Sequence, residues 1–597
     1  MNYKTPGVYV EEVSLLPPSV AQVETAIPAF IGYTEKANTQ NGEELWNKPT
    51  RIKSLLEYEL YFGKTNTQNI EVTLSDDAPF APQSVAFLDD EEQPYRMYQA
   101  LQMYFANGGG PCFIVSVGDY DGTTVTPSLD AIDDYAELKA GLDEVRKIDE
   151  VTLLVFPEAD RLNPIQYYDL YKDALGQCFD LKDRFAVFDV LPNDTDGSNF
   201  RDNIGVNSLS YGAAYYPYVN TKLPQPFTDA SVTFSHGASD SFDGASMAQL
   251  NTVASVLENQ AQIASAKAQA DAAVTAAALP GTVKAAKMAQ YKIALGATEK
   301  AVRNAQQAFD MVEDEAFTSS DLDDAIAGLL DVENANISTA NTNAEIDGAT
   351  SDLATVSAET ETAIVAILAQ VNTDQSVAAA RNTNIQTFYT NAFLADVNGL
   401  LQNFTVQMPA SSAVVGIYAR TDETRGVWKA PANVSVNMVN GPTVKVDNTD
   451  NDSFNVHPTG KSINVIRSFT GKGTMVWGAR TLDGNSNEWR YVSVRRFFNM
   501  VEESVKKASE QFVFENNDAN TWVKVKAMIE NFLIVQWRSG ALMGAKPEEA
   551  FFVNIGLGET MTPDDVFNGY MIVEIGMAVV RPAEFIILRF SHKMLES

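Results

Sequence analysis

An abrupt change in composition divides this chain of 597 residues into unlike parts. Between residues 240 and 385 alanine dominates and tryptophan is absent. The only aromatic residues of that stretch are Phe242, Tyr291, Phe309 and Phe317. Tyr291, Leu295, Val302 and Phe309 recur at the spacing of one helical face. With 7 basic and 20 acidic residues the stretch carries a net charge of −13. We therefore predict a separate, thinly packed helical domain over residues 236–404, with a solvated acidic face.

The region before it, residues 31–235, alternates apolar runs with a helical pattern. The runs at 112–117, 151–156 and 185–191 are predicted as buried strands, and 212–219 as another strand. Between two of these runs, residues 163–183 have helical spacing with Pro164 near the start. A strand, a helix and a strand of these lengths favour a parallel α/β sheet.

From about residue 405 the chain is globular again, and its last part differs in charge. Residues 461–597 hold 16 acidic and 16 basic residues, whereas the whole chain carries a net charge of −35. Two helices are predicted there. The first, over 495–512, has an apolar stripe made of Phe497, Val501, Val505, Ala508 and Phe512. The second begins at a capping Asn520 or Thr521 and ends at Gly540, with Arg538 in its last turn.

Both termini carry short strand patterns. Val8, Tyr9, Val10 and Val13 follow a Pro-Gly breaker at the start of the chain. Phe585, Ile586, Ile587, Leu588 and Phe590 form a strongly β-prone run near its end. A terminal strand needs a partner, because chain ends otherwise fray. From these residues alone, a hairpin between the two termini and pairing with another chain are equally open.

Composition and charge limit the function classes. The excess of acidic residues argues against nucleic-acid binding, which needs a basic face. The N-terminus shows no signal peptide, and no apolar run reaches the length of a membrane span. Cys112 and Cys178 are too few for a disulfide framework, so we expect reduced thiols and synthesis in the cytoplasm.

No motif with catalytic, cofactor or metal-binding spacing stands out. The three histidines lie far apart in the chain, and neither "TGKGT" at 470–474 nor "NGGGP" at 107–111 has the spacing of a phosphate loop, so both are predicted as turns. "DNTDNDSF" at 447–454 resembles half a calcium loop, but Ser453 replaces its glycine and Thr459 its closing glutamate. We therefore expect no enzyme activity, no cofactor and no metal ion.

Several long segments closely resemble the contractile tail sheath family of phages and phage-tail-like injection systems. They are "YKTPGVYVEEV" at 3–13, "VVGIYARTDETRGVWKAPAN" at 414–433, "INVIRSFTGKGTMVWGARTL" at 463–482, "WRYVSVRRFFNMVEESV" at 489–505, "ALMGAKPEEAFFVNIG" at 541–556 and "RPAEFIILRF" at 581–590. The resemblance covers roughly 1–235 and 405–597, so residues 236–404 are interpreted as an insertion.

The resemblance implies a mixed α/β, multidomain fold. Its parts would be an N-terminal strand arm (1–30), an α/β sheath domain (31–235), the inserted helical outer domain (236–404), a C-terminal α/β core that faces an inner tube (405–580) and a C-terminal strand arm (581–597). The strand residues of both arms would pair with neighbouring subunits. Without the resemblance the hairpin would remain as good an interpretation; with it, subunit exchange is favoured.

The implied function is that of a structural subunit that polymerises as a helical array of rings, expected to be hexameric, and contracts to drive an inner tube through a target envelope. Its partners would be other copies of itself, the tube protein, and baseplate and terminal cap proteins, with no nucleic acid and no membrane insertion. The particle would assemble in a bacterial cytoplasm, as a phage tail or a tail-like particle that can be released. Candidate tube-facing residues are Lys506 and Lys507 on the first C-terminal helix, which is favoured, and Lys524 on the second. An acidic surface-layer protein or adhesin is the structural alternative, and an α/β hydrolase is the enzymatic one.

Overall fold

A computed structural model describes residues 20–75, 81–88, 95–120, 134–235, 245–248, 284–311, 351–356 and 391–589, with scattered positions between 251 and 362. The chain divides into two compact units. Unit 1 consists of residues 1–66, 94–223 and 405–597, and unit 2 of residues 67–93 and 224–404. Unit 2 thus takes in a segment of the first globular region and begins before residue 236, where the change in composition placed the boundary.

Unit 1 is built on a nine-stranded sheet with the order β13-β16-β15-β8-β7-β6-β1-β5-β2. The strands are β1 (Pro28–Tyr33), β2 (Thr50–Ile52), β5 (Cys112–Gly118), β6 (Leu153–Val155), β7 (Phe185–Asp189), β8 (Gly212–Tyr216), β13 (Val434–Ser435), β15 (Ile463–Phe469) and β16 (Gly473–Val476). The six strands from β5 to β15 in this order are parallel, and β2, β16 and β13 are antiparallel to their neighbours. The predicted parallel α/β sheet is therefore confirmed. Turns lie at 107–108 and 470–472, and β16 begins at Gly473 within the second predicted turn.

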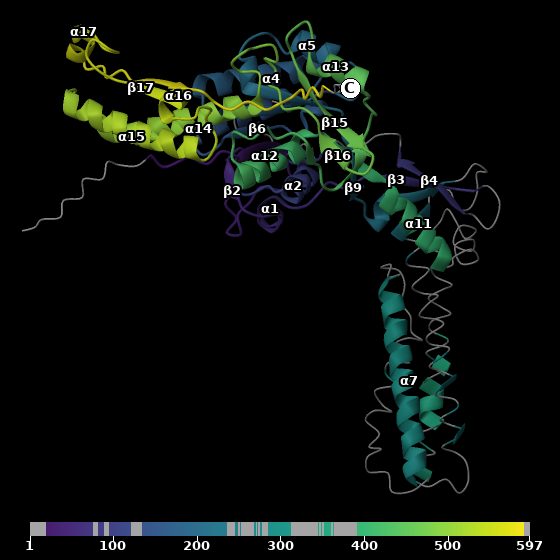
Figure 1. The fold of residues 1–597 in the computed structure, drawn as a ribbon. Coiled ribbons are helices and arrows are strands. Elements are labelled where there is room, and N and C mark those ends of the chain that lie inside the picture. The colour runs from purple at the N-terminus through teal and green to yellow at the C-terminus, as the bar shows by residue number, and fades with distance from the viewer. Residues whose placement is uncertain are drawn as a thin grey trace, which may run out of the picture. The chain divides into compact units, whose positions relative to one another are not determined.

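Helices cover both faces of this sheet, as Figure 1 shows for α4 and α5 on one side and α1, α2 and α12 on the other. The helices are α1 (Leu55–Phe62), α2 (Met97–Ala106), α3 (Asp134–Val145), α4 (Pro164–Leu181), α5 (Ser198–Asn203), α12 (Ser411–Arg425) and α13 (Asn448–Asn455). Each face has its own core of buried apolar side chains. Gly416 allows α12 to pack closely on α2, because a Cβ there would lie 2.5 Å from the carbonyl oxygen of Tyr104.

Two local predictions can be compared with helix starts in unit 1. Pro164 occupies the first turn of α4, as expected, and Asn163 caps this helix. The segment that resembles half a calcium loop is α13, whose N-terminus is closed by a capping box between Asp447 and Asp450. A three-stranded sheet beside the large one has the order β12-β9-β14, from Thr405–Met408, Val219–Pro224 and Val439–Pro442.

The C-terminal part of unit 1 has a core of its own around α14 (Val492–Ser509) and α15 (Ala519–Arg538). It also contains α16 (Pro547–Ala550), β17 (Phe551–Asn554), α17 (Pro563–Phe567) and β18 (Glu574–Met577). Phe497 and Val501 of the predicted stripe are buried, and Val505, Ala508 and Phe512 pack against the same core. The predicted cap of α15 was wrong: Asp518, not Asn520 or Thr521, accepts the hydrogen bonds of the first free N–H groups.

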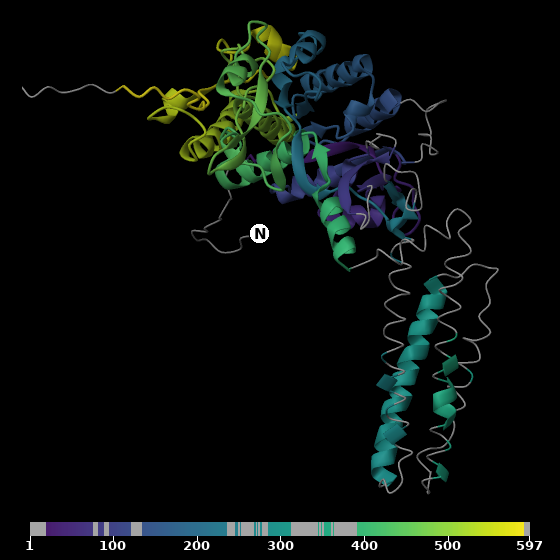
Figure 2. The ribbon, with the colours of Figure 1, turned by 90° about the vertical axis from the view of Figure 1, so that its right-hand side faces the viewer.

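Unit 2 contains a small sheet with the order β11-β10-β3-β4 and the helices α7 and α11, and residues 351–356 are also helical. Its elements are β3 (Ile70–Leu74), β4 (Pro82–Phe87), β10 (Val232–Ser235), β11 (Ala245–Ser246), α7 (Lys284–Met311) and α11 (Asn391–Asn403). Its core joins these strands to Phe393, Val397 and Leu401 of α11. Figure 2 shows α7 as one long helix, which agrees with the periodicity of residues 291–309. Of the described helices in the chain, none is long and apolar enough to cross a lipid bilayer.

The order of the parallel strands reverses at β1. A buried side chain of the protein itself lies there, at the carboxyl ends of the strands. In such sheets ligands usually bind at the carboxyl ends of the strands, where the order reverses. Here the buried carboxylate of Glu158 follows β6 and accepts backbone hydrogen bonds from Tyr33 (2.9 Å), Arg96 (2.8 Å) and Met97 (2.7 Å). Burial raises the pKa of Glu158 to about 7. Glu158 thus ties the end of β1 to the start of α2.

A second buried carboxylate, Asp189 at the end of β7, predicts a pH dependence of stability. Its Oδ1 accepts a hydrogen bond of 2.9 Å from the backbone N–H of Ser411, and burial raises its pKa to about 7. An unfolded aspartate has a pKa of about 3.9, so between the two values the folded chain holds a proton that the unfolded chain releases. Asp189 should therefore lower the free energy of unfolding by about 1.4 kcal/mol for each pH unit that the pH rises within this window.

Urea unfolding of the wild type and of Asp189→Asn at several pH values between 4 and 7.5 would measure this contribution. The asparagine keeps an oxygen for Ser411 but cannot ionise. The variant should lose less stability than the wild type as the pH rises. Equal slopes for the two proteins would contradict the assignment.

Candidate assembly surfaces

The first described residues of the chain form a strap across α14. The backbone N–H of Val23 donates to Ser504 Oγ (3.1 Å), and Thr25 Oγ1 donates to Asp422 Oδ2 of α12 (2.6 Å). Arg496 Nη2 of α14 donates to the carbonyl oxygen of Thr25 (2.8 Å). We call residues 22–27 the N-terminal strap. The strap directly precedes β1, and these hydrogen bonds attach it to two helices of unit 1, α12 and α14.

A buried ion pair lies under this strap. Arg496 Nη2 and Asp422 Oδ2 are 2.6 Å apart, and their side chains are 3% and 7% exposed. The guanidinium also stacks on the ring of Tyr418, 4.7 Å from its centre. Removal of one partner of such a pair typically costs about 3–5 kcal/mol, because the other charge stays buried and unpaired. The place where the N-terminal segment joins the domain is therefore fixed.

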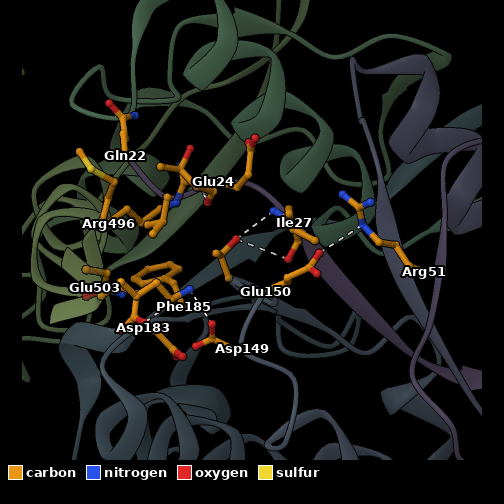
Figure 3. A pocket seen from close by; sticks show the side chains of 16 residues that line it. Gln22, Glu24, Ile27, Arg51, Asp149, Glu150, Asp183, Phe185, Arg496 and Glu503 are labelled. Atoms are coloured by element: carbon orange, nitrogen blue, oxygen red, sulfur yellow. Dashed lines mark hydrogen bonds and ion pairs between the residues drawn. The ribbon is translucent and has the colours of Figure 1, made fainter. Parts of the chain in front are cut away.

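A cavity of about 300 Å³ opens beside the strap, and Figure 3 shows the charged side chains around it. Acidic residues come from the strap (Glu24), the loop before β6 (Asp149 and Glu150), the loop before β7 (Asp183) and α14 (Glu503). Basic groups neutralise part of this charge, since Arg51 Nε lies 3.3 Å from Glu150 Oε2. Among the described residues no group of three or more His, Cys, Asp or Glu side chains is placed to hold a metal ion.

The structure places the three candidate tube-facing lysines in different environments. Lys507 Nζ lies 2.5 Å from Asp149 Oδ2 at the rim of this cavity, and Lys506 Nζ lies 3.1 Å from Glu503 Oε2. Both ion pairs help to raise the pKa of these lysines. Lys524 is exposed on α15 and has no ion pair or hydrogen bond with any residue that the structure describes. It shares an exposed face with Asn531, Val535 and Arg538.

The C-terminal arm leaves the domain at Glu584. Arg480 Nη2 lies 2.6 Å from Glu584 Oε2, and Tyr491 and Asn455 also donate hydrogen bonds to this carboxylate. After Glu584 the side chains of Phe585, Ile586, Ile587 and Leu588 are 70–79% exposed. In Figure 2 the end of the described arm projects away from the domain. Residues 581–589 form no strand within the described chain, so their strand pairing stays a prediction.

The remaining predicted arm residues, Val8, Tyr9, Val10, Val13 and Phe590, lie outside the described residues.

A small two-stranded sheet in the C-terminal part offers edges to which further strands could add. β17 and β18 are antiparallel, with Phe551 opposite Met577 and Asn554 opposite Glu574. Phe552 covers Gly576, where a Cβ would lie 2.2 Å from the ring. Within the described residues, no strand pairs with the outer edge of β17. An unpaired edge is a template for another chain.

Comparisons with known proteins agree with the resemblance seen in the sequence. Residues 485–593 match the phage tail sheath C-terminal domain family. The chain is 26% identical over 127 residues to the tail sheath protein of Vibrio phage KVP40, and 27% identical over 138 residues to that of Salmonella phage ViI. These alignments span 21% and 23% of this chain, and only 19% and 21% of the two relatives.

Solved structures match over nearly the whole chain. The helical sheath of the anti-feeding prophage in its contracted state is 25% identical, with a TM-score of 0.51, over 99% of this chain and all of that one. A chain of the anti-feeding prophage baseplate is also 25% identical, with a TM-score of 0.52 and the same coverage. The sheath complex of an extracellular contractile injection system, PVC, in its contracted state is 24% identical with a TM-score of 0.51, and covers 99% of both chains.

Proposed function

We infer that this chain, whose homologues are contractile sheath proteins of phage tails and phage-like injection systems, is itself the subunit of a contractile sheath. The observation that carries the proposal is the fold match to a contracted helical sheath along 99% of the chain. The homologues are structural proteins, so we assign this chain a mechanical role without a chemical step.

We propose that the arms link the subunits by adding strands to a neighbour's sheet. The donors are Val8 to Val13 of the N-terminal arm and Phe585 to Phe590 of the C-terminal arm. The receiving sheet is the β17–β18 pair, because no strand of the described residues pairs with its outer edges. Backbone hydrogen bonds along an added strand supply affinity, and the exposed apolar side chains of the arm would then be covered.

Such links would build rings, which we propose are hexameric, stacked as a helical array around an inner tube. We place the tube contact on α15, with Lys524 as its charged residue. Lys506 and Lys507 remain candidates, although each is held by an acidic side chain of its own subunit. The ends of the array would meet baseplate and cap proteins, and assembly would take place in a bacterial cytoplasm.

Contraction would be a repacking of subunits that remain linked by their arms. Interfaces of packed elements have discrete arrangements, so a sheath can be held in one and released to another. The arms belong to unit 1, and so do the strap and the β17–β18 pair. Residues 236–404 belong to unit 2, and we propose that this insertion is an outer domain that contraction does not need.

Electron microscopy of the purified full-length chain tests the proposal. A sheath subunit forms tubes of stacked rings, and the spacing between rings should be long when the inner tube protein is added and short without it. A surface-layer protein would form flat arrays instead, and an enzyme would remain dispersed.

A further inference from the structure

The side chain of Glu584 is bound more extensively than the exposed position of the arm would suggest. Its Oε1 accepts hydrogen bonds from Asn455 Nδ2 (2.6 Å) and Arg480 Nε (2.9 Å). Its Oε2 accepts from Arg480 Nη2 (2.6 Å) and from the hydroxyl of Tyr491 (3.0 Å). Two of the four bonds form a bidentate guanidinium–carboxylate pair, the strongest common type of side-chain pairing.

The donors are themselves fixed in the domain. The side chain of Arg480 is only 4% exposed, and its Nη1 donates to the carbonyl oxygen of Gly484 (3.2 Å). The backbone N–H of Arg480 donates to Asn464 Oδ1 of β15 (2.8 Å). Asn455 ends α13, and Tyr491 is the N-cap residue of α14. Glu584 is thus held by residues from three places in the fold, namely the end of α13, the segment after β16 and the N-cap of α14.

The carboxylate is charged in this setting. Burial alone would raise the pKa of Glu584, but the hydrogen bonds from Arg480 and Asn455 outweigh it, so the pKa lies below its usual value. A charged carboxylate with four donors is a strong, directional attachment.

The attachment is also the last one along the described part of the chain, which ends at residue 589. Just before it, the backbone N–H of Val580 donates to the carbonyl oxygen of Ala541 (3.0 Å). After it, no hydrogen bond or ion pair joins residues 585–589 to the part of the chain that the structure describes. The boundary between the fixed and the free part of the arm therefore falls between Glu584 and Phe585.

We propose that Glu584 fixes the direction in which the C-terminal arm leaves the subunit, and that this direction selects the neighbouring copy that the arm reaches. Glu584 is a positioning residue, since it acts through the strand that follows it. Without the anchor the arm would keep its apolar strand but would sample many directions. It could then pair with wrong copies. This inference rests on the proposed role as a sheath subunit.

The first test measures the direction of the arm in the monomer. Cys112 and Cys178 are buried, so spin labels can be placed selectively on Lys472→Cys, in the turn between β15 and β16, and on Leu588→Cys. Pulsed electron paramagnetic resonance should give a narrower distance distribution in this background than after Glu584→Ala, because the free segment between Glu584 and the label is only four residues long. Tyr491→Phe removes one of the four bonds without changing the arm, and should broaden the distribution less.

Glu515→Ala is the matched control, because Glu515 is an exposed glutamate of the same C-terminal part and should leave the distance distribution as it is in the background. A distribution in Glu584→Ala as narrow as in the background would overturn the anchor.

The second test compares assembly by electron microscopy. Glu584→Ala should still associate but lose long, regular tubes in favour of short or irregular ones. Regular tubes of wild-type length, formed by a variant whose arm distance is broad, would overturn the selection of the neighbour. If the wild type forms no tubes, the proposed function fails, and the distance measurement still decides whether Glu584 anchors the arm.

Discussion

Chains that lack residues 1–13 are expected to fold like the wild type and to form no long sheaths. The first described residue that packs against a core of unit 1 is Val20, and the strap begins at Gln22, so the deletion removes no described residue of either. What it removes is the strand pattern of Val8 to Val13, which we propose pairs with a neighbour. Each lost strand removes a row of intersubunit hydrogen bonds, and the loss is repeated at every subunit of the array.

Sedimentation of the assembled fraction, together with circular dichroism of the soluble fraction, would measure both halves of this expectation. A chain that lacks residues 591–597 is the matched control, since it loses a terminal segment and keeps the strand of Phe585 to Phe590. The control should assemble. Long sheaths of normal yield from the chain without residues 1–13 would contradict the arm model.

Lys524→Glu is expected to give sheaths that polymerise but are empty or contracted. Lys524 is exposed on α15 and pairs with no described residue, so the reversal of its charge should leave the fold intact. A single exposed ion pair contributes about 0–1 kcal/mol, which is weak enough to break during contraction. The same contact repeated over every subunit can nevertheless hold a long sheath on its tube. High salt should weaken this hold, because the Debye length falls to about 3 Å at 1 M.

Co-expression with the inner tube protein, followed by counts of tube-filled extended particles, would test this contact. Lys506→Glu is the matched control on α14, where Lys506 is paired with Glu503 of its own subunit. Lys507→Glu is less suitable as a control, since Lys507 is less exposed than Lys506 and lies against two carboxylates, those of Asp149 and Glu503. If Lys524→Glu gives filled, extended particles at normal yield and Lys506→Glu does not, the tube contact lies on α14, as the sequence favoured.

The central sheet could be predicted because its strands are continuous apolar runs bounded by turns. The runs that begin at Cys112 and Phe185 are buried strands, and Pro164 lies in the first turn of the intervening helix, as expected. Such patterns are local and reflect burial on both faces of a parallel sheet. The start of α15 was misplaced because several residues near it can cap a helix, and only the backbone decides that Asp518 does.

The candidate assembly surfaces depend on contacts between residues that are distant in the sequence, and the sequence alone could not predict these contacts. Lys507 forms an ion pair with Asp149, which lies far from it in the chain. The sequence of the helix alone therefore suggested that the charge of Lys507 had no partner within the subunit. Glu584 was overlooked for the same reason, because Arg480 and Tyr491 are its partners only in the fold. The one signal was a lone acidic residue directly before an apolar run.

Helical order in electron micrographs of the purified full-length chain tests the central claim most directly. We predict tubes of stacked rings, with the extended form in the presence of the inner tube protein and a shorter, wider form in its absence or after mild denaturant. The same chain found only as dispersed monomers, under conditions in which circular dichroism shows it to be folded, would contradict the claim that it is a contractile sheath subunit.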